Sequence, residues 1–384
     1  MHRSVSIGLQ RQLLLMQIRP RGRGGVRFYR KGESAPELRS QPAGAAFDRE
    51  MDLSEDELVA AIARVISAPS PGVRVGIGDD AALVSVRMGE LALTTDMLVE
   101  DVLFDRALIA PRDLGYKAVA VNLSDIAAVG ASPRYILVSL GLPPDVEPAW
   151  VMELYGGMVE ACGEHAVSIV GGDLSGAPRI VISVTLAGET PAGRAVLRSG
   201  AGPGQRIAVT GSLGASAGGL MLSRSSKAVL AEALTAGWGR ELLRAHERPQ
   251  ARIGEGQTLA QAGATAMMDL SDGLSRDLRR LCRASGVGAT IRSSAIPIAP
   301  ALASLAKRLE IDALELALSG GEDYELLAVI PADALDEARA RLRDRFAVAL
   351  TEIGETTEDG ILREDADGTA RPLEPSGWDH FTRG

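Results

Sequence analysis

The sequence has few of the residues that act as nucleophiles, thiolate ligands or general bases. Of its 384 residues, only 2 are cysteines, Cys162 and Cys282, and only 4 are histidines. Two thiols cannot form a disulfide framework or a four-thiolate zinc site. The longest apolar runs, such as Ile180 to Ala187, fall short of the roughly 20 residues that span a bilayer. We therefore expect a soluble globular protein of a reducing compartment, the cytoplasm, with no membrane partner.

Positive charge is also scarce, with 41 Lys+Arg against 50 Asp+Glu and a net charge of −9. Because a nucleic-acid surface requires a basic face, this balance argues against nucleic acid as a partner. Residues 1–50 carry +6 and the remainder −15. This basic leader contains Gly-Arg repeats and no periodicity, so we predict that it is disordered or precedes the true start. Met51, followed by the capping box of Ser54 and Glu57, would be a natural first residue.

From Met51 onward, patterns typical of strands and of helices alternate along the chain. Strands are expected at 91–94, 135–141, 167–170, 180–188, 206–210, 266–270, 324–330 and 347–353. Helices are expected at 111–129, 148–165, 274–284 and 332–343, with further helices between 211 and 262. The segment 191–204 is rich in Gly, Pro and Arg and is typical of a domain junction. The sequence therefore predicts two α/β domains, over 51–190 and 191–384.

The usual nucleotide-binding and hydrolase motifs are missing, including the P-loop, H-E-x-x-H and G-x-S-x-G. Aspartate instead recurs beside glycine, serine or threonine. The instances are Gly76-Ile77-Gly78-Asp79-Asp80, Thr94-Thr95-Asp96, Asn122-Leu123-Ser124-Asp125, Gly171-Gly172-Asp173, Asp269-Leu270-Ser271-Asp272-Gly273 and Gly320-Gly321-Glu322-Asp323. Each one alone is typical of a turn or a helix cap.

Taken together, these motifs indicate a metal site. Several of them follow predicted strands, where open α/β sheets bind ligands. Carboxylates in one cleft repel each other by about 4 kcal/mol per pair at 4 Å and an effective dielectric near 20. No Lys/Arg cluster accompanies the motifs, and oxygen-only ligands suit Mg²⁺. Because the neighbouring glycines let backbone amides approach phosphate oxygens, we predict a Mg²⁺-nucleotide site without a P-loop.

Two predicted helices carry particular expectations. Asn122 and Asp125 share a face of helix 111–129, and an aspartate on so apolar a helix favours a ligand over a satisfied structural group. For Asp272, a helix N-cap and a metal ligand remain alternatives. The helix that follows has one apolar stripe that includes Cys282, which we interpret as a packed small hydrophobe.

The motifs, in their order and spacing, resemble the thiamine-monophosphate kinase family. Beyond the aspartate motifs, the matching segments are Tyr116 to Asp125, Leu197-Arg198-Ser199-Gly200-Ala201, Leu318 to Glu325 and Gly377-Trp378-Asp379-His380-Phe381. The resemblance covers the chain from Met51 to its end. It implies the two-domain α/β (α+β) fold of the aminoimidazole ribonucleotide synthetase-like superfamily, with ATP held between the domains and the N-terminal sheets paired across a homodimer.

The resemblance implies transfer of the ATP γ-phosphoryl group to thiamine monophosphate, giving thiamine diphosphate and ADP, the last step of thiamine diphosphate biosynthesis. ATP would be the co-substrate, and several Mg²⁺ ions would be bound. The implied metal ligands are Asp80, Thr94, Thr95, Asp96, Asp125, Asp173, Asp269 and Asp272. The implied ATP contacts are Tyr155, Gly172, Asp173, Arg198 and Ser271, and the implied acceptor contacts are Leu103, Glu322 and Trp378. Because a phosphate monoester is already ionised at pH 7, direct in-line transfer needs no catalytic base and no covalent intermediate.

Two residues depart from the family pattern. Leu103 stands where the family has a histidine, and Asp101 where it has a glycine. The leucine side chain can neither donate nor accept a hydrogen bond. Because the family histidine is a substrate contact, this departure concerns binding of the acceptor. The alternatives are another ATP-dependent enzyme of the superfamily with a different acceptor, and a nucleotide-binding protein without turnover. For Trp378, stacking on a heteroaromatic cation and a C-terminal packing anchor are both open.

Overall fold

The computed structural model describes residues 73–75, 79, 82–86 and 89–378. The expectations for residues 1–50, and the predicted ligand Asp80, lie outside these residues. None of the helices in the described part of the chain combines the length and the apolar character needed to cross a membrane.

The first sheet has six strands in the order β1-β2-β3-β6-β4-β5. Their bounds are β1 Val73–Val75, β2 Ala82–Val86, β3 Gly89–Val99, β4 Ser132–Leu142, β5 Ser168–Gly176 and β6 Val181–Thr190. β4 and β5 are parallel, and the other neighbours are antiparallel. Along β3, Ala92, Thr94 and Leu98 are buried while Thr95 and Met97 are exposed. One face of this sheet is therefore covered and the other is open.

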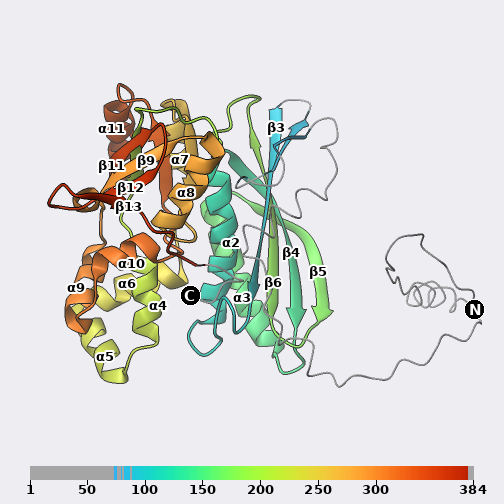
Figure 1. Cartoon of the computed structure of the whole chain (residues 1–384). Helices are drawn as coiled ribbons and strands as arrows, with labels where there is room; N and C mark the ends of the chain where they lie inside the picture. Colours follow the sequence, from blue (N-terminus) through green and yellow to red (C-terminus); the bar gives the residue numbers. More distant parts are fainter. Residues whose placement is uncertain (1–72, 76–78, 80–81, 87–88, 379–384) are drawn as a thin grey trace, which may run out of the picture. The chain divides into compact units, whose positions relative to one another are not determined.

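Helices α2 (Pro111–Ala128) and α3 (Pro148–Glu164) lie against the covered face, as Figure 1 shows. Each begins with a proline at its first position, where the missing N–H costs no hydrogen bond. α2 is buried without interruption from Leu114 to Ser124. At the crossing of the two helices, a Cβ at Gly157 would lie 1.7 Å from the Arg112 carbonyl oxygen, so only glycine allows this approach. The polar residues of α2 between Leu114 and Ser124 therefore face protein, not solvent.

The second sheet has seven strands in the order β13-β12-β9-β11-β7-β10-β8. Their bounds are β7 Arg206–Thr210, β8 Ala266–Asp269, β9 Gly288–Arg292, β10 Leu326–Ile330, β11 Leu350–Thr357, β12 Ile361–Glu364 and β13 Ala370–Pro372. The helices are α4 Ala215–Ser223, α5 Lys227–Ala236, α6 Trp238–Glu247, α7 Ile253–Gln261, α8 Leu274–Ser285, η2 Ser293–Ala295, α9 Pro300–Leu309, α10 Ala313–Ser319 and α11 Leu335–Phe346. The α/β fold class predicted from the sequence is confirmed, and the domain bounds at 190 and 191 stay a prediction.

The apolar stripe predicted for α8 is also confirmed. Leu274, Leu278, Leu281 and Cys282 are each at most 1% exposed and pack in one core cluster. Burial raises the pKa of the Cys282 thiol to about 11, which keeps it protonated. Cys282 is therefore a packing residue.

Two strands extend past their predicted ends and include predicted site residues. β3 continues to Val99, so Thr94, Thr95 and Asp96 lie within it, and β5 runs through Asp173 to Gly176. Both extensions are held by ladder bonds to neighbouring strands, β6 for β3 and β4 for β5. The expectation that these carboxylates follow strand ends is therefore wrong for Asp96 and Asp173, and right for Asp269, the last residue of β8.

The α2–α3 crossing predicts a sharp difference between two glycines of α3. Gly157→Ala should lower the free energy of unfolding by about 1–3 kcal/mol or more, because its methyl group would collide with backbone. A Cβ added at Gly163 would have no heavy atom within 4 Å. Gly163→Ala should therefore be neutral or stabilising by up to about 1 kcal/mol. Urea unfolding of both variants measures the difference, and equal stabilities would contradict the close crossing.

Candidate active site

Polar side chains of β3 and α2 meet on the covered face of the first sheet. Thr94 Oγ1 donates a hydrogen bond to Asp125 Oδ2. Asn122 Oδ1 accepts from the Asp96 backbone N–H at 3.1 Å, and its Nδ2 donates to the Ala118 carbonyl at 3.0 Å. Asn122 is fully buried. These bonds place Thr94, Asp96 and Asp125 at one contact between strand and helix, as the shared face of residues 122 and 125 predicted.

Helix α2 also contacts the second domain, through Ser124. Ser124 Oγ donates to Asp269 Oδ2 at 2.6 Å, and Asp269 is only 2% exposed. Because Ser124 lies between Asn122 and Asp125 in sequence, one turn of α2 contacts β3 of the first domain and the Asp269 carboxylate of the second.

Tyr324 shows how closely the acidic residues gather. Burial raises the pKa of its phenol, and the charges of Glu322, Asp96, Asp269 and Asp272 raise it further. Since the effect of a charge falls with distance, these four carboxylates lie around one buried phenol. Carboxylates up to 226 positions apart in the sequence therefore converge, as expected for Asp96, Asp269 and Asp272.

Asp272 is not a helix cap. α8 begins at Leu274 with Gly273 as its N-cap, and no side chain caps it. Arg280 instead donates to Asp272 Oδ2 and, at 3.1 Å, to Asp277 Oδ1. The sequence predicts no Lys/Arg cluster beside the motifs, and at Asp272 the structure places a single arginine, one turn of α8 after Asp277. Burial and the charge of Asp272 raise the pKa of Asp277 to about 7.

The segments carrying Ser271, Glu322 and Trp378 lie side by side at the start of α8. The Glu322 N–H donates to the Ser271 carbonyl at 2.7 Å, and the Trp378 N–H donates to the Asp272 carbonyl at 3.1 Å. Arg276 Nη1 donates to the Trp378 carbonyl at 2.6 Å. Trp378 is 46% exposed, so about half of its surface is accessible for stacking. A predicted ATP contact and two predicted acceptor contacts are thus neighbours.

Sequence reasoning missed two residues beside Glu322. Lys117 Nζ lies 2.8 Å from Glu322 Oε1, and His246 Nδ1 lies 3.2 Å from Oε2. Burial raises the pKa of Glu322, but Lys117 and His246 act more strongly and hold it at about 2. The signal that could have revealed Lys117 is a single cation within an apolar helix that buries every side chain from Leu114 to Val121.

Thr95 and Asp173 lie on the open face of the sheet. Alternation along β3 turns Thr95 away from Thr94 and Asp96, and its hydroxyl bonds to the Val184 carbonyl at 3.0 Å. Asp173 is exposed on β5, which is the third strand from β3 in the order β3-β6-β4-β5, or ~14 Å away. Gly172 is on β5 as well. One chain therefore does not bring all the predicted ligands together.

The remaining predicted residues differ in their surroundings. Arg198 is half-buried, and its charge acts on Asp277. Tyr155 on α3 and Leu103 both pack against the apolar core of the first domain. Asp101 has a φ of 67°, in the region that favours glycine, and it pairs with Arg179 at 2.7 Å. The aspartate therefore keeps the backbone conformation that a glycine would adopt.

The ligand atoms within one chain suit a hard cation. They are carboxylate and hydroxyl oxygens, the donors that Mg²⁺ prefers. Among the residues that the structure describes, however, no three Asp, Glu, His or Cys side chains lie close enough to hold a metal ion. Bound Mg²⁺ would therefore need further oxygens, and substrate phosphates and water commonly provide them.

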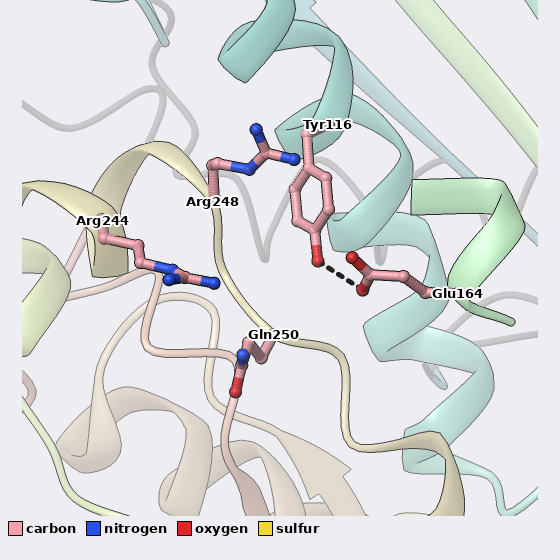
Figure 2. Close-up of a pocket in the computed structure, with 5 residues that line it drawn as sticks. All are labelled: Tyr116, Glu164, Arg244, Arg248 and Gln250. Atoms are coloured by element: carbon pink, nitrogen blue, oxygen red, sulfur yellow. Dashed lines mark hydrogen bonds between the residues drawn. The ribbon is translucent and has the colours of Figure 1, made fainter. Parts of the chain in front are cut away.

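A separate polar cavity of about 280 Å³ lies beside α2 and is lined by Tyr116, Glu164, Arg244, Arg248 and Gln250 (Figure 2). Arg248 stacks 4.2 Å from the centre of the Tyr116 ring, and the Tyr116 hydroxyl donates to Glu164 at 2.8 Å. Arg248 also pairs with Asp113 and Glu160. None of the predicted site residues lines this cavity. The contacts of Tyr116 and Arg248 stabilise the packing of α2 against the elements around it.

Comparison with known proteins tests the predicted family. Two family models, AIR synthase related protein N-terminal and C-terminal domains, match residues 78–190 and 202–366. Thiamine-monophosphate kinase of Escherichia coli (strain K12) is 41% identical over 317 residues, which are 80% of this chain and 92% of the relative. The chain belongs to the thiamine-monophosphate kinase family. The thiamine-monophosphate kinase of Aquifex aeolicus is 39% identical over 306 residues, 79% of this chain and 92% of that protein.

Solved structures agree with this family. One described as AaThiL complexed with AMPPCP and TMP has a TM-score of 0.75 at 35% identity, covering 88% of this chain and all of that one. Hydrogenase maturation protein HypE, at 22% identity and a TM-score of 0.60, shares the fold alone. The predicted enzyme class, a thiamine-phosphate kinase, is confirmed.

The low pKa of Glu322 predicts acid sensitivity. Because the folded-state value of about 2 lies below the ordinary 4.5, ionised Glu322 contributes stability above pH 4.5 that is lost as the pH falls toward 2. Glu322→Gln should therefore have a shallower loss of unfolding free energy between about pH 5 and 3 than the wild type. Denaturant unfolding at several pH values measures the slopes, with exposed Glu374→Gln as the control. Identical slopes in all three proteins would contradict the assignment.

Proposed function

We propose that this member of the thiamine-monophosphate kinase family transfers the γ-phosphoryl group of ATP to thiamine monophosphate, with Mg²⁺ bound at the carboxylates beside α2. The observation that carries the proposal is the convergence of Asp96, Asp125 and Asp269 on one turn of a buried helix. The relatives named thiamine-monophosphate kinase support the reaction, and the related structure with AMPPCP and TMP supports the pair of ligands.

The Mg²⁺ ions would be held by oxygens from both domains. Within one chain these are the side chains of Thr94, Asp96, Asp125, Asp269 and Asp272, with Asp80 as a further predicted ligand. When bound, Mg²⁺ reduces the repulsion between the donor and acceptor phosphates.

The protein groups bind and orient the two substrates. Arg198 would contact ATP phosphates through its planar guanidinium, and Ser271 lies at the junction of the two predicted subsites. Trp378, which is 46% exposed, would stack on the thiamine moiety, and the carboxylate of Glu322 would compensate the positive charge of that moiety. No base is required, since the acceptor phosphate is ionised at pH 7. Transfer would then be direct and in line.

The open face of the first sheet supports a homodimer. It exposes apolar side chains on two strands, with Met97 55%, Tyr135 54% and Leu137 49% exposed. Such a patch on a sheet is typical of a protein interface. Thr95 and Asp173 lie on the same face, so pairing of two sheets would bring these predicted ligands near a second chain.

The metal assignment predicts loss of turnover without loss of fold. Asp125→Asn should lower kcat by at least about 100-fold, because several kcal/mol of charge stabilisation depend on the bound metal. Asp113→Asn, on the same helix, removes only a partly exposed pair with Arg248 and should retain most activity. The assay follows thiamine diphosphate and ADP over a Mg²⁺ titration. Full activity of Asp125→Asn, or turnover in EDTA, would refute the assignment.

The dimer proposal predicts that one charge on the open face separates the chains. Leu137→Lys should move the protein from dimer to monomer in sedimentation velocity, because it buries an unpaired ammonium in the interface. Met152→Lys is the control, since Met152 is 69% exposed on α3 and lies on the opposite side of the sheet. A wild-type protein that sediments as a monomer at micromolar concentration would contradict the dimer.

A further inference from the structure

We propose that Lys117 and His246 are positioning residues for the acceptor, which fix the Glu322 carboxylate and leave its open edge to a cationic heteroaromatic ring. The inference rests on the proposed function, because it takes Glu322 to contact the acceptor. It assigns a role to two residues that belong to different domains and to none of the aspartate motifs.

Three separate elements build the cluster. Lys117 comes from α2, His246 from α6 and Glu322 from the segment between α10 and β10. Each carboxylate oxygen has its own partner, Lys117 on Oε1 at 2.8 Å and His246 on Oε2 at 3.2 Å. Side-chain exposure rises from 1% for Lys117 through 13% for His246 to 25% for Glu322. The carboxylate is therefore the most exposed of the three groups, and its two partners lie deeper in the protein.

The backbone at Glu322 is also held in place by its neighbours. Glu322 and Tyr324 have φ values of 65° and 51°, which non-glycine residues rarely adopt. The N–H groups of both residues donate to backbone carbonyls, that of Glu322 to Ser271 at 2.7 Å and that of Tyr324 to Leu270 at 2.9 Å. Left-handed residues that the surrounding structure holds in place are typical of functional sites. The segment therefore carries Glu322 in one orientation next to the predicted ATP contact Ser271.

His246 is oriented by a further contact. Its Nδ1 lies 3.1 Å from Ser216 Oγ as well as 3.2 Å from Glu322 Oε2. A carboxylate only accepts hydrogen bonds, so the proton belongs on Nδ1. Ser216 is in the first turn of α4, and Asp323 accepts from the Gly214 N–H at 2.7 Å just before that helix. His246 and Asp323 are thus both bonded to the N-terminal end of α4.

Lys117 also connects the acceptor contact to the phosphate end of the site. It shares α2 with Asn122 and Asp125, which lie about 8 and 12 Å further along the helix axis. These spans are within the length of a phosphorylated two-ring heterocycle. A single buried helix would therefore set the distance between the ring-binding carboxylate and the metal-binding carboxylates.

A purely structural ion pair in this chain has a different form. Arg252 and Glu325 are 15% and 9% exposed, and Thr210 Oγ1 completes the partners of Glu325 at 2.6 Å. Both ends of that pair are enclosed. In the Glu322 cluster the carboxylate is instead the most exposed group, at 25%, so a ligand can reach it while its two partners stay covered.

The test compares variants of the full-length protein in steady-state kinetics with thiamine monophosphate and ATP. His246→Leu and Lys117→Met should each raise the KM for thiamine monophosphate by about 10- to 100-fold, the effect of one charge-assisted hydrogen bond. The KM for ATP should change by less than about threefold. His246→Asn keeps an N–H donor near the position of Nδ1 and should restore most of the acceptor KM. Arg252→Met is the control for loss of a buried cation, and should lower stability with the acceptor KM unchanged.

The outcomes separate this inference from the proposed function. An active wild type whose acceptor KM is unchanged in His246→Leu overturns the positioning role and leaves the kinase function intact. An equal rise in Arg252→Met overturns it too, because general loosening would then explain the effect. If Lys117→Met does not fold, the His246→Leu and His246→Asn pair decides. If the wild type binds thiamine monophosphate by calorimetry without turnover, the same variants are compared by Kd. A wild type that neither turns over nor binds it overturns both proposals.

Discussion

The site depends on helix α2, which is buried yet carries polar side chains that bond to residues of two domains. An unpaired carboxylate in such surroundings would be costly, and two of those here have a hydroxyl donor: Thr94 for Asp125 and Ser124 for Asp269. The apolar remainder of α2 fixes the helix against the sheet and α3. The positions of the donors, and hence of the acidic oxygens, follow from that packing.

Local sequence patterns could predict much of this arrangement. Proline at the start of α2, its apolar length and the spacing of Asn122 and Asp125 indicated the helix and its polar face. Strand extent was harder, because β3 and β5 continue where long-range pairing supports them and not where the local pattern ends. The same extension separates Thr95 from Thr94, since alternation within a strand assigns neighbours to opposite faces. A motif of three adjacent ligands could not reveal that division.

The residues that sequence reasoning missed differ in where their partners lie. Lys117 and His246 gain their roles from a partner that is distant in sequence, whereas the partners of Arg280 lie within eight residues of it. Glu322 lies 205 positions after Lys117, on the other domain. Arg280 belongs to a helix whose pattern indicates only packing and solvent faces. Charge pairing across domains therefore required the structure, whereas the acidic motifs themselves did not.

The fold alone does not choose the acceptor, because HypE has the same architecture with a different described role. What distinguishes a thiamine-phosphate kinase must then lie in side chains that face the acceptor. The Leu103 position is one candidate, but its side chain packs against the core of the first domain. Glu322 has a stronger physical case, since its carboxylate is partly exposed and is fixed in position by Lys117 and His246. Selectivity for a cationic ring would follow from that fixed carboxylate, while α2 holds the phosphate end at a set distance.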